Sequence, residues 1–267
     1  MTTLRYGRHV TGGVDILKGL RQTLNEGGTA AQVFAGSPMS YQTDYFKQPT
    51  RWHDVRLLTE EIYTVVHASY FCLITQSPDD GNKRDMSRRT VLRTLEWAQF
   101  IGAHAVVIHP GSTLLPGWEK HARSFLEEID AQYPGGPKLL LETMAGRTSL
   151  GRDLTDIAAL AKEVNSDKFG VCVDLTHSWS AGLSISSLTL LGQQSTLWGI
   201  DLVHFNAPNP DIMRGGHRDR HTVSFADSAW DDETLERLWG AYKHLPCILE
   251  GTPNAKGDYA KLVEWSK

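Results

Sequence analysis

The sequence predicts a single (β/α)8 TIM barrel over residues 1–267, with a metal site at the carboxyl ends of its strands. Eight short apolar runs recur at intervals of roughly 25 to 45 residues, the spacing of repeated strand–helix units. Stretches with apolar residues at helical spacing fill the intervals. Six of the runs end in a histidine, an aspartate or a glutamate. Because the active site of such a barrel lies where the strands end, these six side chains are expected to meet in one place.

The eight predicted strands follow one another along the chain. The first two are expected at 5–10 and 31–35. The other six are the runs that end at His67, His109, Glu142, Asp174, His204 and Glu250. Side chains alternate between the two faces of a strand, so Val107 shares a face with His109, whereas Ile108 lies on the other face. Since both faces are apolar, the strands are expected to be buried on both sides, as in a parallel sheet covered by helices.

Helices are expected between the strands. The clearest begins near Asn82 and carries apolar residues at helical spacing as far as Ile101, with Gly102 as a stop signal. With this regular alternation and no linker segment, we expect no second domain. The remaining helices are predicted at 13–25, 54–62, 117–132, 153–164, 184–192, 231–243 and 258–265.

Composition and cysteine usage indicate the compartment of the protein but do not indicate its function. The start of the chain is polar and no apolar run approaches about 18 residues, so we expect neither a signal peptide nor a membrane partner. The three cysteines, Cys72, Cys172 and Cys247, are odd in number and lack zinc-finger spacing, which favours buried thiols in a reducing compartment. We therefore expect an intracellular protein of the cytoplasm, nucleoid or nucleus that is not secreted, and we expect a monomer.

Three further residues join the six strand-end residues as candidate metal ligands. His177 follows Asp174 by three residues, and Asp219 and His221 lie close together after His204. Imidazole and carboxylate ligands without thiolate suit zinc, and they also suit manganese. The formal net charge of −4 does not exclude a nucleic-acid partner, because three divalent cations would more than offset it and would focus positive charge at the strand ends.

These candidate ligands lie in recognisable short segments of the sequence. The segments are VVHASY, HPGS, LLLETMAG, GVCVDLTHSWSAG, LVHFN, RDRH and ILEGTP. Together, from Tyr6 to Thr252, they resemble the endonuclease IV family of abasic-site nucleases, and all nine candidate ligands occur in the family's order. Each segment is weak evidence alone, but their common order makes the resemblance specific.

The resemblance implies a metal-dependent phosphodiesterase that acts on double-stranded DNA containing abasic sites. In this family three metal ions, usually zinc, lie at the carboxyl end of the barrel, and the phosphodiester on the 5′ side of the abasic site is hydrolysed to leave a 3′-hydroxyl. Glu142 is the implied catalytic bridge between two metals, and manganese remains possible at one site. The implied ligand groups are His67, His109 and Glu142, then Glu142, Asp174, His204 and Glu250, and finally His177, Asp219 and His221.

The resemblance also implies residues that read DNA. Tyr70 and Phe71 occupy the positions whose side chains wedge into DNA at the lesion in relatives, where aromatic rings can stack on exposed bases. Met39 and Tyr41 stand where family members generally carry an arginine and a tryptophan. Met39 and Arg220 are therefore predicted DNA contacts, the first of them in a loop that departs from the family.

Several other residues near the predicted metal ligands bear on the function, either as support for a ligand or as departures from the family. His9 on the first strand is placed to orient a metal ligand or the phosphate. Ala207 stands where relatives usually have an acidic residue, residues 223–228 replace a glycine–glutamate–glycine element, and Arg147 stands where a neutral amide is common. These departures leave the nine ligands intact and put the substrate range in question.

Two other functions stay open at the level of sequence. A sugar isomerase or epimerase on the same barrel would also place histidines and acids at strand ends, but it needs only one or two metals and has no use for the group of His177, Asp219 and His221. A non-catalytic damage-binding relative would explain the altered loops, but it would have no need to retain every ligand. Incision of a defined abasic duplex before and after chelation separates all three functions.

Overall fold

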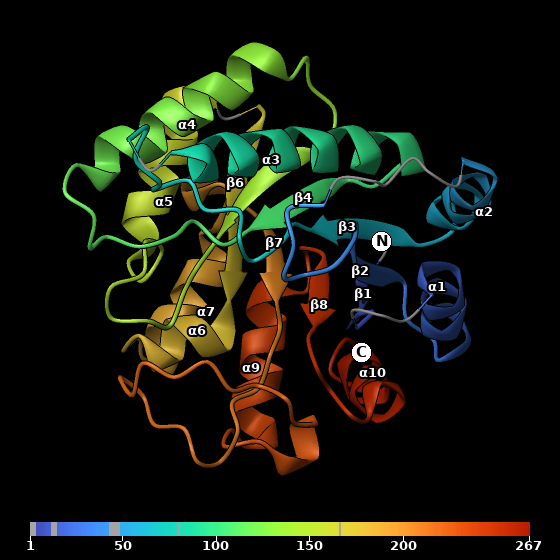
Figure 1. The fold of residues 1–267 in the computed structure, drawn as a ribbon. Helices are drawn as coiled ribbons and strands as arrows, with labels where there is room; N and C mark the ends of the chain where they lie inside the picture. The colour runs from blue at the N-terminus through green and yellow to red at the C-terminus, as the bar shows by residue number, and fades with distance from the viewer. Residues whose placement is uncertain (1–3, 12–14, 43–48, 80, 166) are drawn as a thin grey trace.

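A computed structural model describes residues 4–11, 15–42, 49–79, 81–165 and 167–267. Eight parallel strands pair in the order of the chain, and β1 pairs with β8 to close a barrel, as predicted (Figure 1). The strands are β1 (Tyr6–His9), β2 (Ala30–Phe34), β3 (Tyr63–His67), β4 (Ala105–Ile108), β5 (Lys138–Glu142), β6 (Phe169–Asp174), β7 (Ile200–His204) and β8 (Cys247–Leu249).

Helices surround this barrel in Figure 1, with α3 and α4 side by side along one side and α9 and α10 on the opposite side. Within the described part of the chain, no helix combines the length and apolar character that a membrane crossing requires. The elements are α1 (Ile16–Asn25), α2 (Pro49–Thr59), α3 (Asn82–Ile101), α4 (Trp118–Gln132), α5 (Leu154–Asn165), α6 (Leu175–Ser180), α7 (Ile185–Gln193), α8 (Ser195–Trp198), η2 (Phe225–Asp227), α9 (Asp232–Tyr242) and α10 (Ala255–Glu264).

The predicted helices are confirmed, with shifts at their ends. Helix α3 stops where Gly102 adopts a left-handed φ of 78°, a conformation that glycine adopts without strain. Helix α2 lies about five residues earlier than the predicted 54–62 at its start, because it begins at Pro49, a residue whose fixed φ suits a first helical position. The first two residues of the predicted 13–25 helix lie outside the described residues. Helices α6 and α8 were not predicted.

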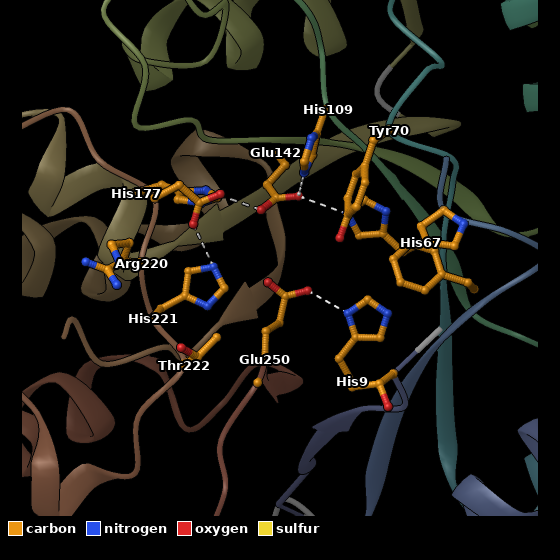
Figure 2. Close-up of a pocket in the computed structure, with 15 residues that line it drawn as sticks. His9, His67, Tyr70, His109, Glu142, His177, Arg220, His221, Thr222 and Glu250 are labelled. Atoms are coloured by element: carbon orange, nitrogen blue, oxygen red, sulfur yellow. Dashed lines mark hydrogen bonds and ion pairs between the residues drawn. The ribbon is translucent and has the colours of Figure 1, made fainter. Parts of the chain in front are cut away.

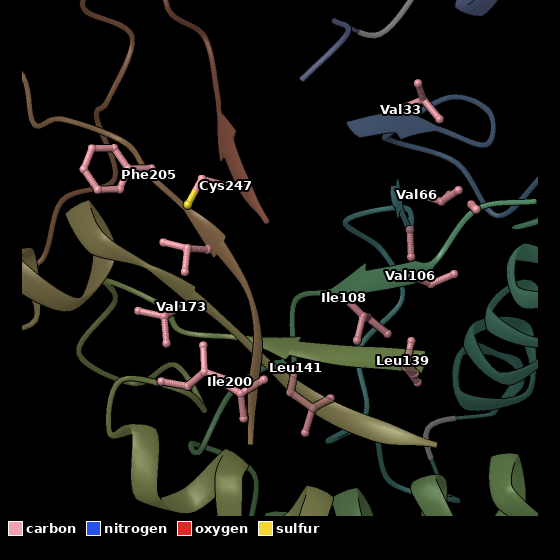
Figure 3. Close-up of a cluster of buried hydrophobic side chains, with 14 of the residues drawn as sticks. Val33, Val66, Val106, Ile108, Leu139, Leu141, Val173, Ile200, Phe205 and Cys247 are labelled. Carbon is pink, nitrogen blue, oxygen red and sulfur yellow. The ribbon is translucent and has the colours of Figure 1, made fainter. Parts of the chain in front are cut away.

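Two apolar layers flank the strands, as the alternation of side chains predicts. The outward layer packs against the helices and includes Val33, Val66, Val106, Ile108, Leu139, Leu141 and Val173 (Figure 3). The inward layer fills the barrel and comprises Ala30, Val65, Ala105, Val107, Leu140, Cys172, Leu202 and Ile248. Each strand from β3 to β8 therefore carries an inward apolar residue two positions before the polar side chain at or just after its end, and in β2 Ala30 precedes Gln32 in the same way, so these polar side chains rest on an apolar floor.

A close approach between β1 and β2 fixes the register at one side of the barrel mouth. Gly7 lies opposite Ala30, and a Cβ at Gly7 would fall 1.4 Å from the Ala30 carbonyl oxygen. Only glycine fits there. In the same register His9 lies opposite Gln32, so these two side chains enter the mouth of the barrel side by side.

Candidate metal centre

A cavity of about 720 Å³ opens at the carboxyl ends of the strands (Figure 2). Seven of the nine predicted ligands line it, and the other two, Asp174 and His204, are fully buried beside it. The lining ligands are His67, His109, Glu142, His177, Asp219, His221 and Glu250. The structure thus brings together residues that lie as far apart in the chain as β3 and the segment after β8.

The first group of donors comprises His67, His109 and Glu142. The Nε2 atoms of both histidines lie 3.3 Å from Oε2 of Glu142. The Nδ1 of His67 lies 2.7 Å from the carbonyl oxygen of Ala68, to which it donates when protonated. That hydrogen bond holds the proton on Nδ1 and leaves the Nε2 lone pair free to face the cavity.

The second group shares Glu142 with the first. Its members are Glu142, Asp174, His204 and Glu250. The Nδ1 of His204 lies 3.1 Å from Oε1 of Glu142 and 3.3 Å from Oε2 of Glu250. The two oxygens of Glu142 therefore face different groups, Oε2 the first and Oε1 the second, which is the arrangement a bridging carboxylate needs.

The third group gathers around Asp219, which comes from the loop after β7. Its Oδ1 lies 3.0 Å from Nε2 of His177 and 2.9 Å from Nε2 of His221. The Nδ1 of His177 lies 2.8 Å from the Thr143 carbonyl oxygen, whereas its buried Nε2 has no hydrogen-bond partner of good geometry among the described residues. Donor atoms of Asp174, His177 and His221 also converge, so Asp174 lies between the second and third groups.

Helix α6 explains how the third group reaches the second. Asp174 ends β6 and caps α6, because its Oδ1 accepts a hydrogen bond of 2.7 Å from the backbone N–H of His177. Ser180 at the end of α6 accepts a hydrogen bond through its carbonyl oxygen from the His217 N–H and another through Oγ from the Arg218 N–H. This short helix therefore positions both His177 and the loop that carries Asp219.

Electrostatics in this cavity favour positive charge. Burial alone would raise the pKa of Glu142, but the imidazoles of His204 and His109 hold it well below its usual range. Burial alone would lower the pKa of His177, but Asp174, Asp219 and Glu142 raise it well above its usual range. In the same way the pKa of His221 is raised to about 9, against the effect of burial, by Asp219 and Asp174.

The nine residues fit divalent metal ions on three grounds. Donor atoms of eight of them converge in three groups, within 4.8 Å of one another in each group, and the ninth, Asp219, lies within 3.0 Å of His177 and His221. Hydrogen bonds from Nδ1 to backbone carbonyls leave the lone pair on Nε2 of His67 and His177 available to bind a metal ion. The buried acids also need compensating positive charge, which cations supply without protonating the histidines.

Two amides that the sequence reasoning missed hold the second group in place. Gln32 Oε1 lies 2.9 Å from Nε2 of His204, and Gln32 Nε2 donates to Oε1 of Glu250 at 2.7 Å. Asn206 Nδ2 donates to Oδ2 of Asp174 at 2.6 Å, and its Oδ1 accepts from the Glu250 N–H at 2.7 Å. A sequence signal existed for Gln32, because it is the one polar residue of the β2 run and follows the inward Ala30 by two positions.

His9 lies beside Glu250, a predicted metal ligand, as the sequence analysis expects. Its Nδ1 is 2.8 Å from Oε1 of Glu250, and burial lowers its pKa. Gln32 Nε2 lies 3.0 Å from the same Nδ1 and donates to it when that nitrogen is unprotonated. His9 therefore contacts a member of the second group and is placed to orient it.

The residues predicted to read DNA divide into two pairs. Tyr70 and Arg220 line the cavity, where the Tyr70 ring stacks on His109 with centroids 4.8 Å apart (Figure 2). Phe71 and Met39 do not line it, although they are exposed by 38% and 58% on neighbouring loops. The Phe71 ring packs against Tyr41, with centroids 5.5 Å apart. The two aromatics of the predicted wedge are about equally exposed, and the structure places Tyr70 in the lining of the cavity and Phe71 outside it.

The barrel and its donor groups define the class of protein. The chain belongs to the family described as xylose isomerase-like TIM barrel, whose model matches residues 24–247. This confirms the barrel fold predicted from the sequence.

Within that class the chain is similar to particular nucleases. It is 28% identical to the probable endonuclease 4 of Staphylococcus aureus (strain Newman) over 285 residues, which cover 98% of this chain and 94% of the relative. A crystal structure of endonuclease IV from Thermus thermophilus matches with a TM-score of 0.81 and 24% identity, covering 98% of each chain. The resemblance to the endonuclease IV family is thereby confirmed.

The same fold also occurs in proteins of other kinds. A crystal structure of a D-tagatose 3-epimerase-like protein matches with a TM-score of 0.73 and 20% identity, covering 98% of this chain and 97% of the other. Because the barrel alone is shared so widely, the function has to be argued from the site.

Proposed function

We propose that this protein is a DNA-repair endonuclease that uses three metal ions to hydrolyse the phosphodiester 5′ to an abasic site, leaving a 3′-hydroxyl. The observation that carries the proposal is the position of Glu142, whose two carboxylate oxygens face two different donor groups. A shared carboxylate of this kind serves a centre with closely spaced metals. The similarity to probable endonuclease 4 supports DNA as the substrate.

The chain supplies ligands for three ions, which we expect to be zinc, with manganese as an alternative at one site. His67, His109 and Glu142 would hold the first ion, and Glu142, Asp174, His204 and Glu250 the second. His177, Asp219 and His221 would hold the third. When bound, such ions neutralise charge on the phosphate and lower the pKa of water, so no serine or cysteine nucleophile is required.

The other cavity residues would position the DNA. Tyr70 offers an aromatic face beside the first donor group, on which an unstacked base or sugar can rest. Arg220 lies on the opposite side of the cavity in Figure 2, close to His221, where its guanidinium can approach a phosphate. Its ion pair with Asp211 would then be exchanged for a contact with DNA. We expect the enzyme to act on double-stranded DNA as an intracellular monomer.

An epimerase is the strongest rival, because a D-tagatose 3-epimerase-like protein shares the fold. One or two of the donor groups would suffice for that reaction. The third group would then be unexplained, although His177 and His221 both contact Asp219 within 3.0 Å. This is why we favour the nuclease.

The deciding experiment is incision of a labelled duplex with one abasic site. We expect cleavage 5′ to the lesion, loss of cleavage after chelation, recovery with zinc, and ends that a DNA polymerase extends. An undamaged duplex is the control for non-specific nuclease activity. Borohydride trapping of a covalent protein–DNA adduct, with ends that cannot be extended, would instead show a lyase. Epimerisation of a ketose without incision would favour the rival.

A further inference from the structure

A second cavity, of about 370 Å³, opens at the same end of the barrel as the metal centre. Its lining comes from the loops that follow β4, β5 and α6 and from the first turn of α5. The polar residues of that lining are Thr113, Arg147, Ser149, Arg152, Asp153 and Asp156. We call it the arginine cavity. The metal centre, as described above, does not use any of these six residues.

Backbone hydrogen bonds fix the wall of the arginine cavity to the loop that carries His109. Ser112 and Ser149 form an isolated antiparallel bridge, and the Thr113 N–H donates to the Thr148 carbonyl oxygen at 2.7 Å. The Leu150 N–H donates to the Gly111 carbonyl oxygen at 2.9 Å. The loops after β4 and β5 are thus joined, so the cavity has a preformed shape.

Two arginine side chains in this lining carry positive charges without an ion-pair partner among the described residues. Arg147 and Arg152 are both exposed, and neither guanidinium has an ion-pair or hydrogen-bond partner among the residues that the structure describes. Unpaired guanidinium groups bind phosphates well, often through two parallel N–H···O bonds, and the Ser149 hydroxyl lies in the same lining, whereas the Thr113 hydroxyl already donates to the Thr148 carbonyl oxygen. The lining therefore offers several hydrogen-bond donors to one anion.

Two carboxylates limit how much negative charge the arginine cavity can accept. Asp153 faces its own helix, because its Oδ1 accepts hydrogen bonds from the N–H and the hydroxyl of Thr155. The pKa of Asp156 is raised by burial and then by the nearby charges of Asp153 and Glu119. A second anion would meet this acidic end, so the cavity suits one singly charged phosphodiester better than a polyphosphate.

The length of the chain between the two cavities limits their separation. Thr113 follows His109 by four residues and Arg147 follows Glu142 by five. Even fully extended segments of this length span only about 14 to 18 Å. Each nucleotide of duplex DNA advances about 3.4 Å along the helix axis, so the arginine cavity lies within about five nucleotides of the metal groups.

We propose that the arginine cavity binds one backbone phosphate of the same DNA duplex, a few nucleotides from the phosphodiester at the metal centre. This inference rests on the proposed function, because it takes DNA as the substrate. It adds a contact that fixes the position of the duplex on the enzyme and that does not depend on base sequence.

The test compares Arg147→Ala/Arg152→Ala with Arg93→Ala/Arg237→Ala, a control that removes the same charge from exposed positions on α3 and α9. Binding to an abasic duplex is measured at several salt concentrations, with a methylphosphonate at the scissile linkage so that the strand is not cut. We expect the first variant to bind about tenfold more weakly and its log–log salt slope to fall by about 0.9 for a lost phosphate contact. The control should bind like the unmodified protein.

Shortened duplexes locate the contact and separate it from free phosphate binding. The difference between the two double variants should vanish once the duplex no longer reaches the bound phosphate. Equal binding and equal salt slopes for both variants on the long duplex would overturn the inference. So would loss of inorganic phosphate binding in the arginine variant with no change in DNA binding, since the cavity would then take free anions only.

Incision of an ordinary abasic duplex by the unmodified protein is measured in parallel. If the unmodified protein incises the duplex and the two variants bind DNA equally, the proposed phosphate contact of the arginine cavity is wrong and the proposed nuclease activity stands. If the arginine variant binds DNA more weakly and the unmodified protein shows no incision, the phosphate contact stands and the proposed nuclease activity is wrong. Hydrolysis of bis(p-nitrophenyl) phosphate should be the same for both variants, which checks that the metal groups are intact.

Discussion

The Oε1 atom of Gln32 lies 2.9 Å from Nε2 of His204, while Nδ1 of the same imidazole faces Glu142 and Glu250. The amide oxygen can only accept a hydrogen bond, so it holds the imidazole proton on Nε2 and keeps the Nδ1 lone pair free. The amide nitrogen of Gln32 donates to Glu250 at 2.7 Å. One neutral, fully buried side chain therefore orients two ligands of the second donor group.

The first prediction follows from this contact. Gln32→Leu keeps a similar volume and removes the hydrogen bonds to His204 and Glu250, together with the contact with His9, so we expect zinc affinity at one site to fall by about 10- to 100-fold while the fold is retained. Titration with a competing chelator measures the affinity. Gln22→Leu is the matched control, because Gln22 is exposed on α1 and its side chain donates a hydrogen bond to the exposed end of Glu26, away from the donor groups. Unchanged zinc affinity in Gln32→Leu would show that Gln32 serves packing alone.

The second prediction concerns the bridging carboxylate. Glu142→Gln keeps the shape of the side chain and removes the negative charge that faces both the first and second groups. We expect incision of an abasic duplex to fall by about two orders of magnitude or more, with DNA binding retained. Incision rates are compared at equal zinc content. Near-normal turnover with all metals bound would mean that the two groups do not share Glu142.

The sequence was sufficient for the barrel and for the six candidate ligands at strand ends, because both follow from a local pattern. A side chain at a strand end points the same way as the residue two positions earlier, so the apolar Val107 and Leu140 already indicated that His109 and Glu142 face the barrel mouth. Gln32 follows the same rule, but an amide is a poor metal ligand, so the pattern by itself does not mark it as part of the site. What decides its role is the contact with His204, which is distant in the sequence.

Loops were less predictable because their contacts are not periodic. Tyr70 and Phe71 are adjacent in the sequence, yet only Tyr70 lines the cavity. The difference arises from the neighbouring loop, since the Tyr70 N–H donates to the Pro38 carbonyl oxygen and the hydroxyl of Tyr41 donates to the Phe71 carbonyl oxygen. Helix α6 was missed for a related reason, because a helix of six residues has too few positions to show periodicity.

The third prediction is the metal content. Three donor groups with Glu142 shared should bind about three divalent ions per chain, predominantly zinc. Elemental analysis of protein purified without added metal tests this number. An Asp219→Asn/His221→Gln variant should lose one ion and keep the others, because both residues belong to the third group alone. A reproducible content near one ion per chain in the unmodified protein would instead favour the epimerase.

The last prediction concerns how the proposed endonuclease would recognise an abasic site. If Tyr70 and Phe71 both stack on DNA, replacing both with alanine removes roughly 1–3 kcal/mol for each base contact, about tenfold or more in activity on an abasic duplex. Hydrolysis of bis(p-nitrophenyl) phosphate needs no opened helix and should change little. Phe100→Ala is the matched control, since Phe100 is exposed by 37% on α3, much like Phe71 at 38%.

The single variants then separate the two aromatics. Tyr70 stacks on His109 inside the cavity, so Tyr70→Ala should reduce incision even on short duplexes. Phe71 lies outside the cavity against Tyr41, so the effect of Phe71→Ala should require a duplex long enough to reach that loop. Equal loss on DNA and on the small phosphodiester would point to damage at His109. No loss on either substrate would mean that both rings only pack within the protein and that other residues, such as Arg220, read the lesion.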